Sequence, residues 1–294
     1  IQLKYVKHYT SIYHIDTYLC SRRRASSKNI FRRSGPFCCR QGLVAKRIVV
    51  SSPIYKIDFD GDGAIDLAVV HLPTFKWYIY SLEKQRIICN GLSWGFAGAQ
   101  VVPGDYDGDN AMDLAIFDAP NGHWYIYSIK RNLILANGGL TWGYAGTKAV
   151  PGDYDGDGKD DLAVFDTVSR FWYICSRGDN VALVYGLRWG FAGCTPVSGD
   201  YDGDGVFDLA VFHGANGQWF IWSPRKGKTI VSGKDWGFSG CTPVSGDFDG
   251  DGVSDLAVYH QATAKWYVWS LAKNKALASG LSWGYSGAIP PTLP

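Results

Sequence analysis

From residue 48 onward, short apolar runs alternate with polar turns, and the whole pattern recurs every 47 or 48 residues. One run reads Leu-Ala-Val or Leu-Ala-Ile, and the next is rich in aromatic residues, as in Trp124-Tyr125-Ile126-Tyr127. Runs of this length and composition predict β-strands. The pairs Asn121-Gly122 and Asn216-Gly217 are strong signals for tight hairpin turns between two such strands.

Two further sequence features return at the same place in all five repeats. The aromatic strand occurs as Trp77-Tyr78-Ile79-Tyr80, Trp124-Tyr125-Ile126-Tyr127, Trp172-Tyr173-Ile174-Cys175, Trp219-Phe220-Ile221-Trp222 and Trp266-Tyr267-Val268-Trp269. Each repeat closes on Trp-Gly-aromatic-small-Gly, which starts at Trp94, Trp142, Trp189, Trp236 and Trp283. With a weaker strand between them and a short segment before the next repeat, each unit offers four short strands.

A four-stranded antiparallel sheet that repeats at 40–50 residues is typical of a β-propeller blade. We therefore expect an all-β fold, a β-propeller of five four-stranded blades, and the alternative is a fragment of a six- or seven-bladed propeller. The segment Ile289-Pro290-Pro291-Thr292 duplicates the strand that precedes each repeat. We expect it to complete the first blade beside Ile54–Ile57.

Each repeat also carries a nine-residue stretch of the form Asp-x-Asp-Gly-Asp-Gly-x-x-Asp, which we call the Asp loop. Calcium takes six to eight oxygen ligands, and the Asp side chains at positions 1, 3, 5 and 9 with the backbone carbonyl of position 7 would supply them. The expected ligands are Asp58, Asp60, Asp62, Ala64 and Asp66; Asp105, Asp107, Asp109, Ala111 and Asp113; Asp153, Asp155, Asp157, Lys159 and Asp161; Asp200, Asp202, Asp204, Val206 and Asp208; and Asp247, Asp249, Asp251, Val253 and Asp255. The sequence thus predicts up to five calcium ions.

Two other interpretations of the Asp loops fit less well. An EF-hand needs a bidentate Glu at position 12 and flanking helices, whereas position 12 is Val or Ile here and a predicted strand follows. Asp and Gly as ordinary turn formers explain one such loop but not five with the same spacing. Magnesium is less favoured because it demands strict octahedral geometry. In the second Asp loop, Asn110 replaces the position-6 glycine. We expect this replacement to weaken calcium binding at the second site without abolishing it.

The Asp loop, followed by Leu-Ala-Val and preceded by a Pro- or Val-Gly segment, resembles the FG-GAP and VCBS-type repeats of integrin α-chain-like propellers. The resemblance covers residues 48–294 in five copies. It implies calcium held in the hairpin between the first two strands of each blade, in extracellular or surface-attached proteins of adhesion and carbohydrate association. The chain departs from integrin-like propellers in having five copies where those have seven.

Charge divides the chain into two parts. Its formal net charge is +2, but residues 1–50 hold eleven Lys or Arg and the single acid Asp16. Twenty of the remaining acids are Asp-loop carboxylates, so the acidity is concentrated at the loops. We expect residues 1–47 to form a basic, poorly ordered segment ahead of the propeller at 48–294. A basic arm for nucleic acid is the weaker reading of its arginines, and no nucleic-acid partner is expected.

The start at Ile1 without Met suggests an N-terminally incomplete chain, and no apolar run is long enough for a signal sequence or a membrane span. Five calcium loops favour an extracellular or cell-surface location, where calcium is abundant. The seven cysteines lack metal-site spacing and predict no disulfide framework.

No nucleophile elbow, helical His-Glu pair or phosphate-binding loop is present, so we expect a non-enzyme that binds a glycan or an extracellular protein. The alternative is an accessory or structural domain of a larger secreted enzyme. The tryptophan columns are read as packing residues rather than sugar platforms. The polar column His71, Asp118, Asp166, His213 and His260 is read as solvated strand ends.

Overall fold

The computed structural model describes residues 57–286, and this part of the chain consists of β-strands and turns. Within these residues no helix is long and apolar enough to cross a membrane. The predicted basic segment 1–47 lies outside the described residues. The four described cysteines, Cys89, Cys175, Cys194 and Cys241, are free thiols.

The strands form five antiparallel sheets, one for each sequence repeat. The first sheet contains β1 (Leu67–His71), β2 (Lys76–Ser81) and β3 (Arg86–Ser93). The second contains β4 (Gln100–Val101), β5 (Leu114–Asp118), β6 (His123–Ser128) and β7 (Leu133–Thr141), and the third contains β8 (Thr147–Ala149), β9 (Leu162–Asp166), β10 (Phe171–Cys175) and β11 (Ala182–Arg188). The fourth contains β12 (Cys194–Val197), β13 (Leu209–His213), β14 (Gln218–Ser223) and β15 (Lys228–Asp235), and the fifth contains β16 (Cys241–Val244), β17 (Leu256–His260), β18 (Lys265–Ser270) and β19 (Lys275–Ser282).

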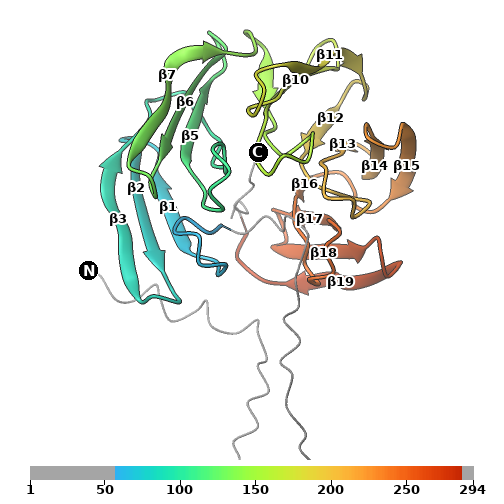
Figure 1. The fold of residues 1–294 in the computed structure, drawn as a ribbon. Helices are drawn as coiled ribbons and strands as arrows, with labels where there is room; N and C mark the ends of the chain where they lie inside the picture. The colour runs from blue at the N-terminus through green and yellow to red at the C-terminus, as the bar shows by residue number, and fades with distance from the viewer. Residues whose placement is uncertain (1–56, 287–294) are drawn as a thin grey trace, which may run out of the picture. The chain divides into compact units, whose positions relative to one another are not determined.

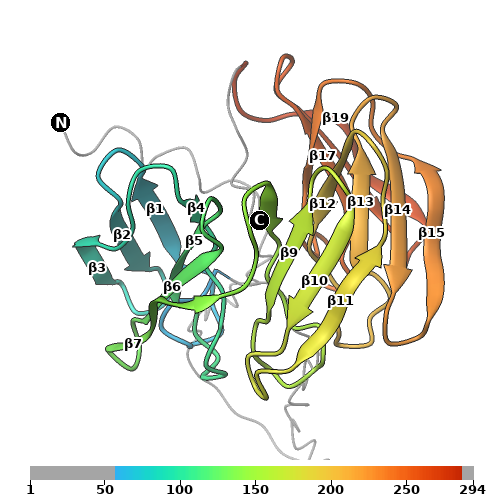
Figure 2. The same cartoon turned by 90° about the horizontal axis from the view of Figure 1, so that it is seen from above.

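The five sheets follow one another around a ring, with the last strand of each sheet on the outside (Figure 1). In the view from above, consecutive strands of one sheet lie side by side, as β12 to β15 do (Figure 2). The predicted five-bladed β-propeller is therefore confirmed. Four sheets have four described strands and the first has three. The segments expected to complete the first blade, Ile54–Ile57 and Ile289–Thr292, fall almost wholly outside the described residues, so that closure stays a prediction.

The aromatic strand of each blade shows where the core lies, because buried and more exposed side chains alternate along it. In β14 the burial alternates along the strand, and Trp219 and Ile221 are both 0% exposed. Successive side chains of a strand point to opposite faces, so every second residue enters the space between two blades. The first four tryptophans of this column, Trp77, Trp124, Trp172 and Trp219, are each at most 1% exposed. The packing interpretation is correct for them.

A hydrogen bond ties the tryptophan of each aromatic strand to the Trp-Gly corner of its own blade. The Trp219 indole N–H donates to the Trp236 carbonyl at 2.9 Å, and the other four blades repeat this bond at 2.8–3.1 Å. The corner also needs glycine, because a Cβ on Gly217, where φ is +74°, would lie 2.1 Å from the Gly237 carbonyl carbon. The Asn-Gly turn and the Trp-Gly corner are therefore one packed unit.

Candidate metal centre

In the second to fifth blades, the Asp loop connects the innermost strand to the next strand, and the backbone closes the loop in all five blades. The N–H of position 9 donates to the carbonyl just before the loop, as from Asp113 to Gly104 at 2.7 Å and from Asp208 to Gly199 at 2.8 Å. The predicted loop positions therefore lie on a single tight turn that leads directly into the Leu-Ala strand.

The carboxylate at position 1 folds the loop around itself. In the fourth loop, Asp200 Oδ1 accepts the Gly203 N–H at 2.7 Å, and Asp200 Oδ2 accepts the Gly205 N–H at 2.8 Å. The same two bonds, from positions 4 and 6, occur in the other four loops at 2.6–2.9 Å. Position 6 has φ between +60° and +88° in every loop, and Asn110 adopts φ +60° there. Asn enters this left-handed region more readily than most residues, so the second loop keeps the shared geometry.

The carboxylate at position 9 is the most buried of each loop. It is at most 3% exposed in all five blades, and its Oδ2 accepts the N–H of position 2, as Asp208 does from Tyr201 at 2.8 Å. Burial raises the pKa of Asp113, Asp161 and Asp255 to about 7 and that of Asp208 to about 8. A nearby divalent cation favours the ionised form of such a carboxyl and opposes this shift.

Carboxylates from separate positions converge in every loop. Three of them offer oxygens within 4.8 Å of one another: Asp58, Asp60 and Asp62; Asp105, Asp107 and Asp113; Asp153, Asp155 and Asp161; Asp200, Asp202 and Asp208; and Asp247, Asp249 and Asp251. The structure therefore brings together positions 1, 3 and 9 in the middle three loops, and positions 1, 3 and 5 in the outer two. Five Asp-rich groups, one per blade, could hold metal ions.

The donor set suits a hard cation because some of its oxygens have no hydrogen bond. Asp107 Oδ1, Asp202 Oδ2 and Asp255 Oδ1 are buried and lack a hydrogen-bond partner. A buried carboxylate oxygen left unpaired is costly, and a cation that takes oxygen ligands removes this cost. The carbonyls expected from Ala64, Ala111, Lys159, Val206 and Val253 stay a prediction, as does the full ligand list. Their N–H groups donate to the position-5 carboxylates at 2.9–3.1 Å.

Neighbouring Asp loops are joined by backbone hydrogen bonds that the sequence does not reveal. The N–H of position 8 donates to the position-1 carbonyl of the preceding loop, from Met112 to Asp58 at 2.7 Å and from Ser254 to Asp200 at 2.7 Å. The third and fourth loops make the same bond at 2.6 and 2.8 Å. The backbone at position 1 of one loop therefore also anchors the backbone of the next loop.

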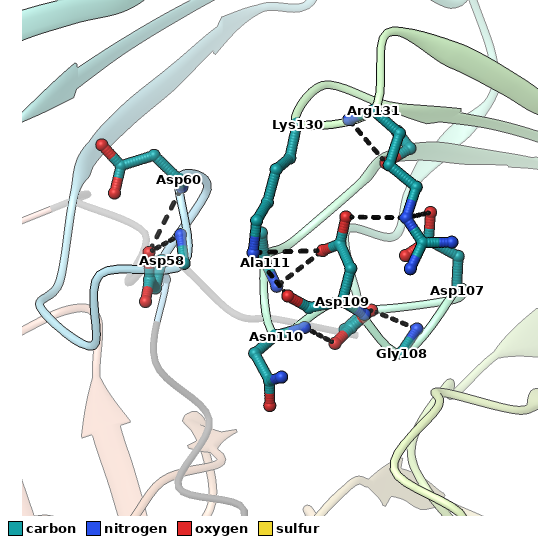
Figure 3. Close-up of polar contacts among 12 residues, drawn as sticks. Asp58, Asp60, Asp107, Gly108, Asp109, Asn110, Ala111, Lys130 and Arg131 are labelled. Atoms are coloured by element: carbon teal, nitrogen blue, oxygen red, sulfur yellow. Dashed lines mark hydrogen bonds and ion pairs between the residues drawn. The ribbon is translucent and has the colours of Figure 1, made fainter.

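Basic side chains also reach the carboxylates, and sequence reasoning missed them. In the second blade, Arg131 Nε lies 3.4 Å from Asp107 Oδ2 and 3.2 Å from Asp109 Oδ2, and Lys130 approaches the same loop (Figure 3). The sequence does contain a sign of these contacts, because a basic residue stands three positions after the serine that ends β2, β6, β14 and β18.

The polar column caps its own hairpin turns. His71, His213 and His260 each hydrogen-bond through Nδ1 to a side chain three residues later, at 2.6–2.7 Å. Asp118 bonds Asn121 at 2.8 Å in the same way. These four agree with the strand-end interpretation, but Asp166 is buried and accepts the Tyr144 hydroxyl at 2.6 Å.

Comparison with known families and structures supports the fold. The model of the FG-GAP-like repeat matches residues 58–116, which contain the first two Asp loops, and confirms the resemblance seen in the sequence. The chain is similar to a lectin of Agrocybe aegerita, whose structure concerns specific recognition of non-reducing terminal N-acetylglucosamine, with 16% identity and a TM-score of 0.55 over 81% of this chain and 69% of that one.

A second similar structure is an auxiliary nutrient-binding protein of Bacteroides thetaiotaomicron, with 10% identity and a TM-score of 0.50. The match covers 79% of this chain but only 59% of that protein. No curated protein matches the sequence. At these identities the two structures show the propeller fold alone.

Proposed function

We propose that this chain is a calcium-binding β-propeller module of a secreted or cell-surface protein, and that it binds a glycan or an extracellular protein. The observation that carries the calcium part is the recurrence of converging carboxylates in five blades, four of which include buried carboxylate oxygens that lack a hydrogen bond. Calcium is favoured over magnesium because its coordination number and geometry are flexible, whereas magnesium demands a near-ideal octahedron. When bound, the ion neutralises carboxylates that would otherwise repel or take up protons.

In this proposal the Asp loops hold the frame and act on binding only indirectly. The Asp loop precedes the Leu-Ala strand of each sheet, whereas the Trp-Gly corner and the hairpin turn lie at the other end of that strand. The two features therefore occupy opposite rims. Calcium would fix the strands of each blade, and the blades would present the opposite rim rigidly to a partner.

The rim with the Trp-Gly corners offers the chemistry that a sugar needs. The third residue of each corner is an exposed aromatic ring: Phe96, Tyr144, Phe191, Phe238 and Tyr285, with exposed fractions of 37–73%. Phe191 lies 4.9 Å from the His213 ring, and Phe238 lies 4.8 Å from the His260 ring. An exposed aromatic face beside a hydrogen-bonding group suits the apolar face and the hydroxyls of a sugar. The similarity to a sugar-binding propeller also supports a glycan as the partner.

We expect binding of the protein to a glycan array or to extracellular proteins in a pull-down, and we expect Phe191→Ala with Phe238→Ala to abolish it. The two rings have exposed faces, so their removal should leave the fold intact. Leu133→Ala, an exposed apolar residue at the start of β7, is the matched control and should bind as the parent does. Turnover of a polysaccharide by this chain, lost on mutating a loop aspartate while fold and calcium persist, would replace this function with an enzymatic one.

A further inference from the structure

Four of the five blades hold a basic side chain over the Asp loop from the same position of a hairpin turn. Lys84, Arg131, Lys226 and Lys273 each contact the carboxylates at positions 3 and 5 of their own loop. Lys273 Nζ lies 2.7 Å from Asp249 Oδ1 and 3.3 Å from Asp251 Oδ2. The ammonium therefore pairs with two of the carboxylates that are the expected cation ligands.

The third blade has the same turn with the opposite charge. In all five blades, the N–H at this position donates to the hydroxyl of the serine three residues earlier, at 3.2–3.4 Å. The next residue is left-handed in every case, with φ between +48° and +59°. Asp179 occupies the position in the third blade. The backbone is therefore equivalent, and only the side chain differs.

The position-5 carboxylate is less exposed in the four blades that have the basic turn residue than in the third blade, which lacks it. The position-5 side chains under a base are 8–19% exposed, whereas Asp157 in the third loop is 32% exposed. Lys159, within the third loop itself, lies 3.5 Å from Asp157 Oδ2 and forms no second ion pair among the described residues. Among the five loops, the third thus has the most exposed position-5 carboxylate and the fewest ion pairs with basic side chains.

We propose that the turn residues Lys84, Arg131, Lys226 and Lys273 are internal counter-cations that compete with the bound ion, so that the third loop, with Asp179, is the tightest calcium site. This inference rests on the proposed calcium binding. A cation within a few ångströms of a divalent ion is repelled by it, and the ion must displace the ammonium or share its carboxylates. The same ammonium neutralises the loop when the ion is absent, which keeps the metal-free blade folded.

Lys273 offers a sharp test because the residue before it in the turn, Ala272, carries no charge. In calcium titrations by calorimetry, the parent should show one tight site and four weaker ones. Lys273→Met should convert one weak site into a tight one, with a gain in calcium affinity of roughly tenfold. It should also lower the melting temperature of the metal-free protein. Lys275→Met removes the same charge from an exposed residue two positions later and should change neither value.

The reverse exchange uses the third blade. Asp179→Lys should remove the tight class and raise the melting temperature of the metal-free protein. Loss of both calcium affinity and metal-free stability in Lys273→Met would show that the lysine is purely structural and would overturn the inference. Five equivalent calcium sites in the parent protein would also overturn it. Equal effects of Lys273→Met and Lys275→Met would do the same. Absence of calcium binding by all these proteins would instead contradict the proposed function itself.

Discussion

Chelation of calcium with EDTA will lower the melting temperature of the propeller by more than about 10 °C. An ion that binds only the folded state stabilises it by about 2.7 kcal/mol at a hundredfold excess over its dissociation constant. In a domain of this size, each kcal/mol shifts the melting temperature by about 2–4 °C. Even two occupied loops therefore produce the expected shift, and five produce a larger one.

The measurement is a thermal melt followed by circular dichroism, first in millimolar calcium, then in excess EDTA, and again after calcium is restored. Magnesium at the same concentration is the control and should restore little of the loss, because it retains its waters and demands octahedral geometry. Equal melting temperatures with and without EDTA, in protein shown by metal analysis to have held calcium, would contradict this prediction.

Trp219→Ala will reduce the free energy of unfolding by about 3–5 kcal/mol. The side chain is 0% exposed and packs against Phe212 and Tyr201, with ring centroids at 5.2 and 6.4 Å. Its removal leaves a cavity between two blades and leaves the Trp236 carbonyl without the indole N–H at 2.9 Å. The loss combines the transfer of buried apolar atoms with the cavity term.

Urea denaturation in saturating calcium measures this effect without interference from the metal sites. Tyr185→Ala is the control, since it also truncates an aromatic ring, but one that is 81% exposed. It should cost about 1 kcal/mol or less. If the two variants lost similar stability, the tryptophan column would not be the structural core of the blades.

The parts of the fold that depend on local pattern could be predicted from the sequence. The alternation in Trp219-Phe220-Ile221-Trp222 predicts which residues are buried, because side chains of a strand alternate between its two faces. Asn216-Gly217 predicts the turn, because its backbone needs a left-handed glycine. The Asp spacing likewise predicts which carboxylates share a turn, and the structure brings three of each set together.

The parts that depend on distant positions could not be predicted in this way. Lys273 lies more than twenty residues after its partner Asp249, so their ion pair depends on how the strands of the blade bring the turn back to the Asp loop. The bond from Ser254 to Asp200 joins two blades, so it depends on how repeats pack rather than on any one repeat. The burial that raises the pKa of Asp208 also depends on how the repeats pack.

Calcium stoichiometry tests the central claim most directly. Protein freed of metal with EDTA and then dialysed to equilibrium against labelled calcium at millimolar concentration should bind five ions per chain. A protein in which Asp200, Asp202 and Asp208 are replaced by Asn should bind four and keep its β-sheet circular dichroism. Binding of no calcium at millimolar concentration by the folded parent protein would contradict the account.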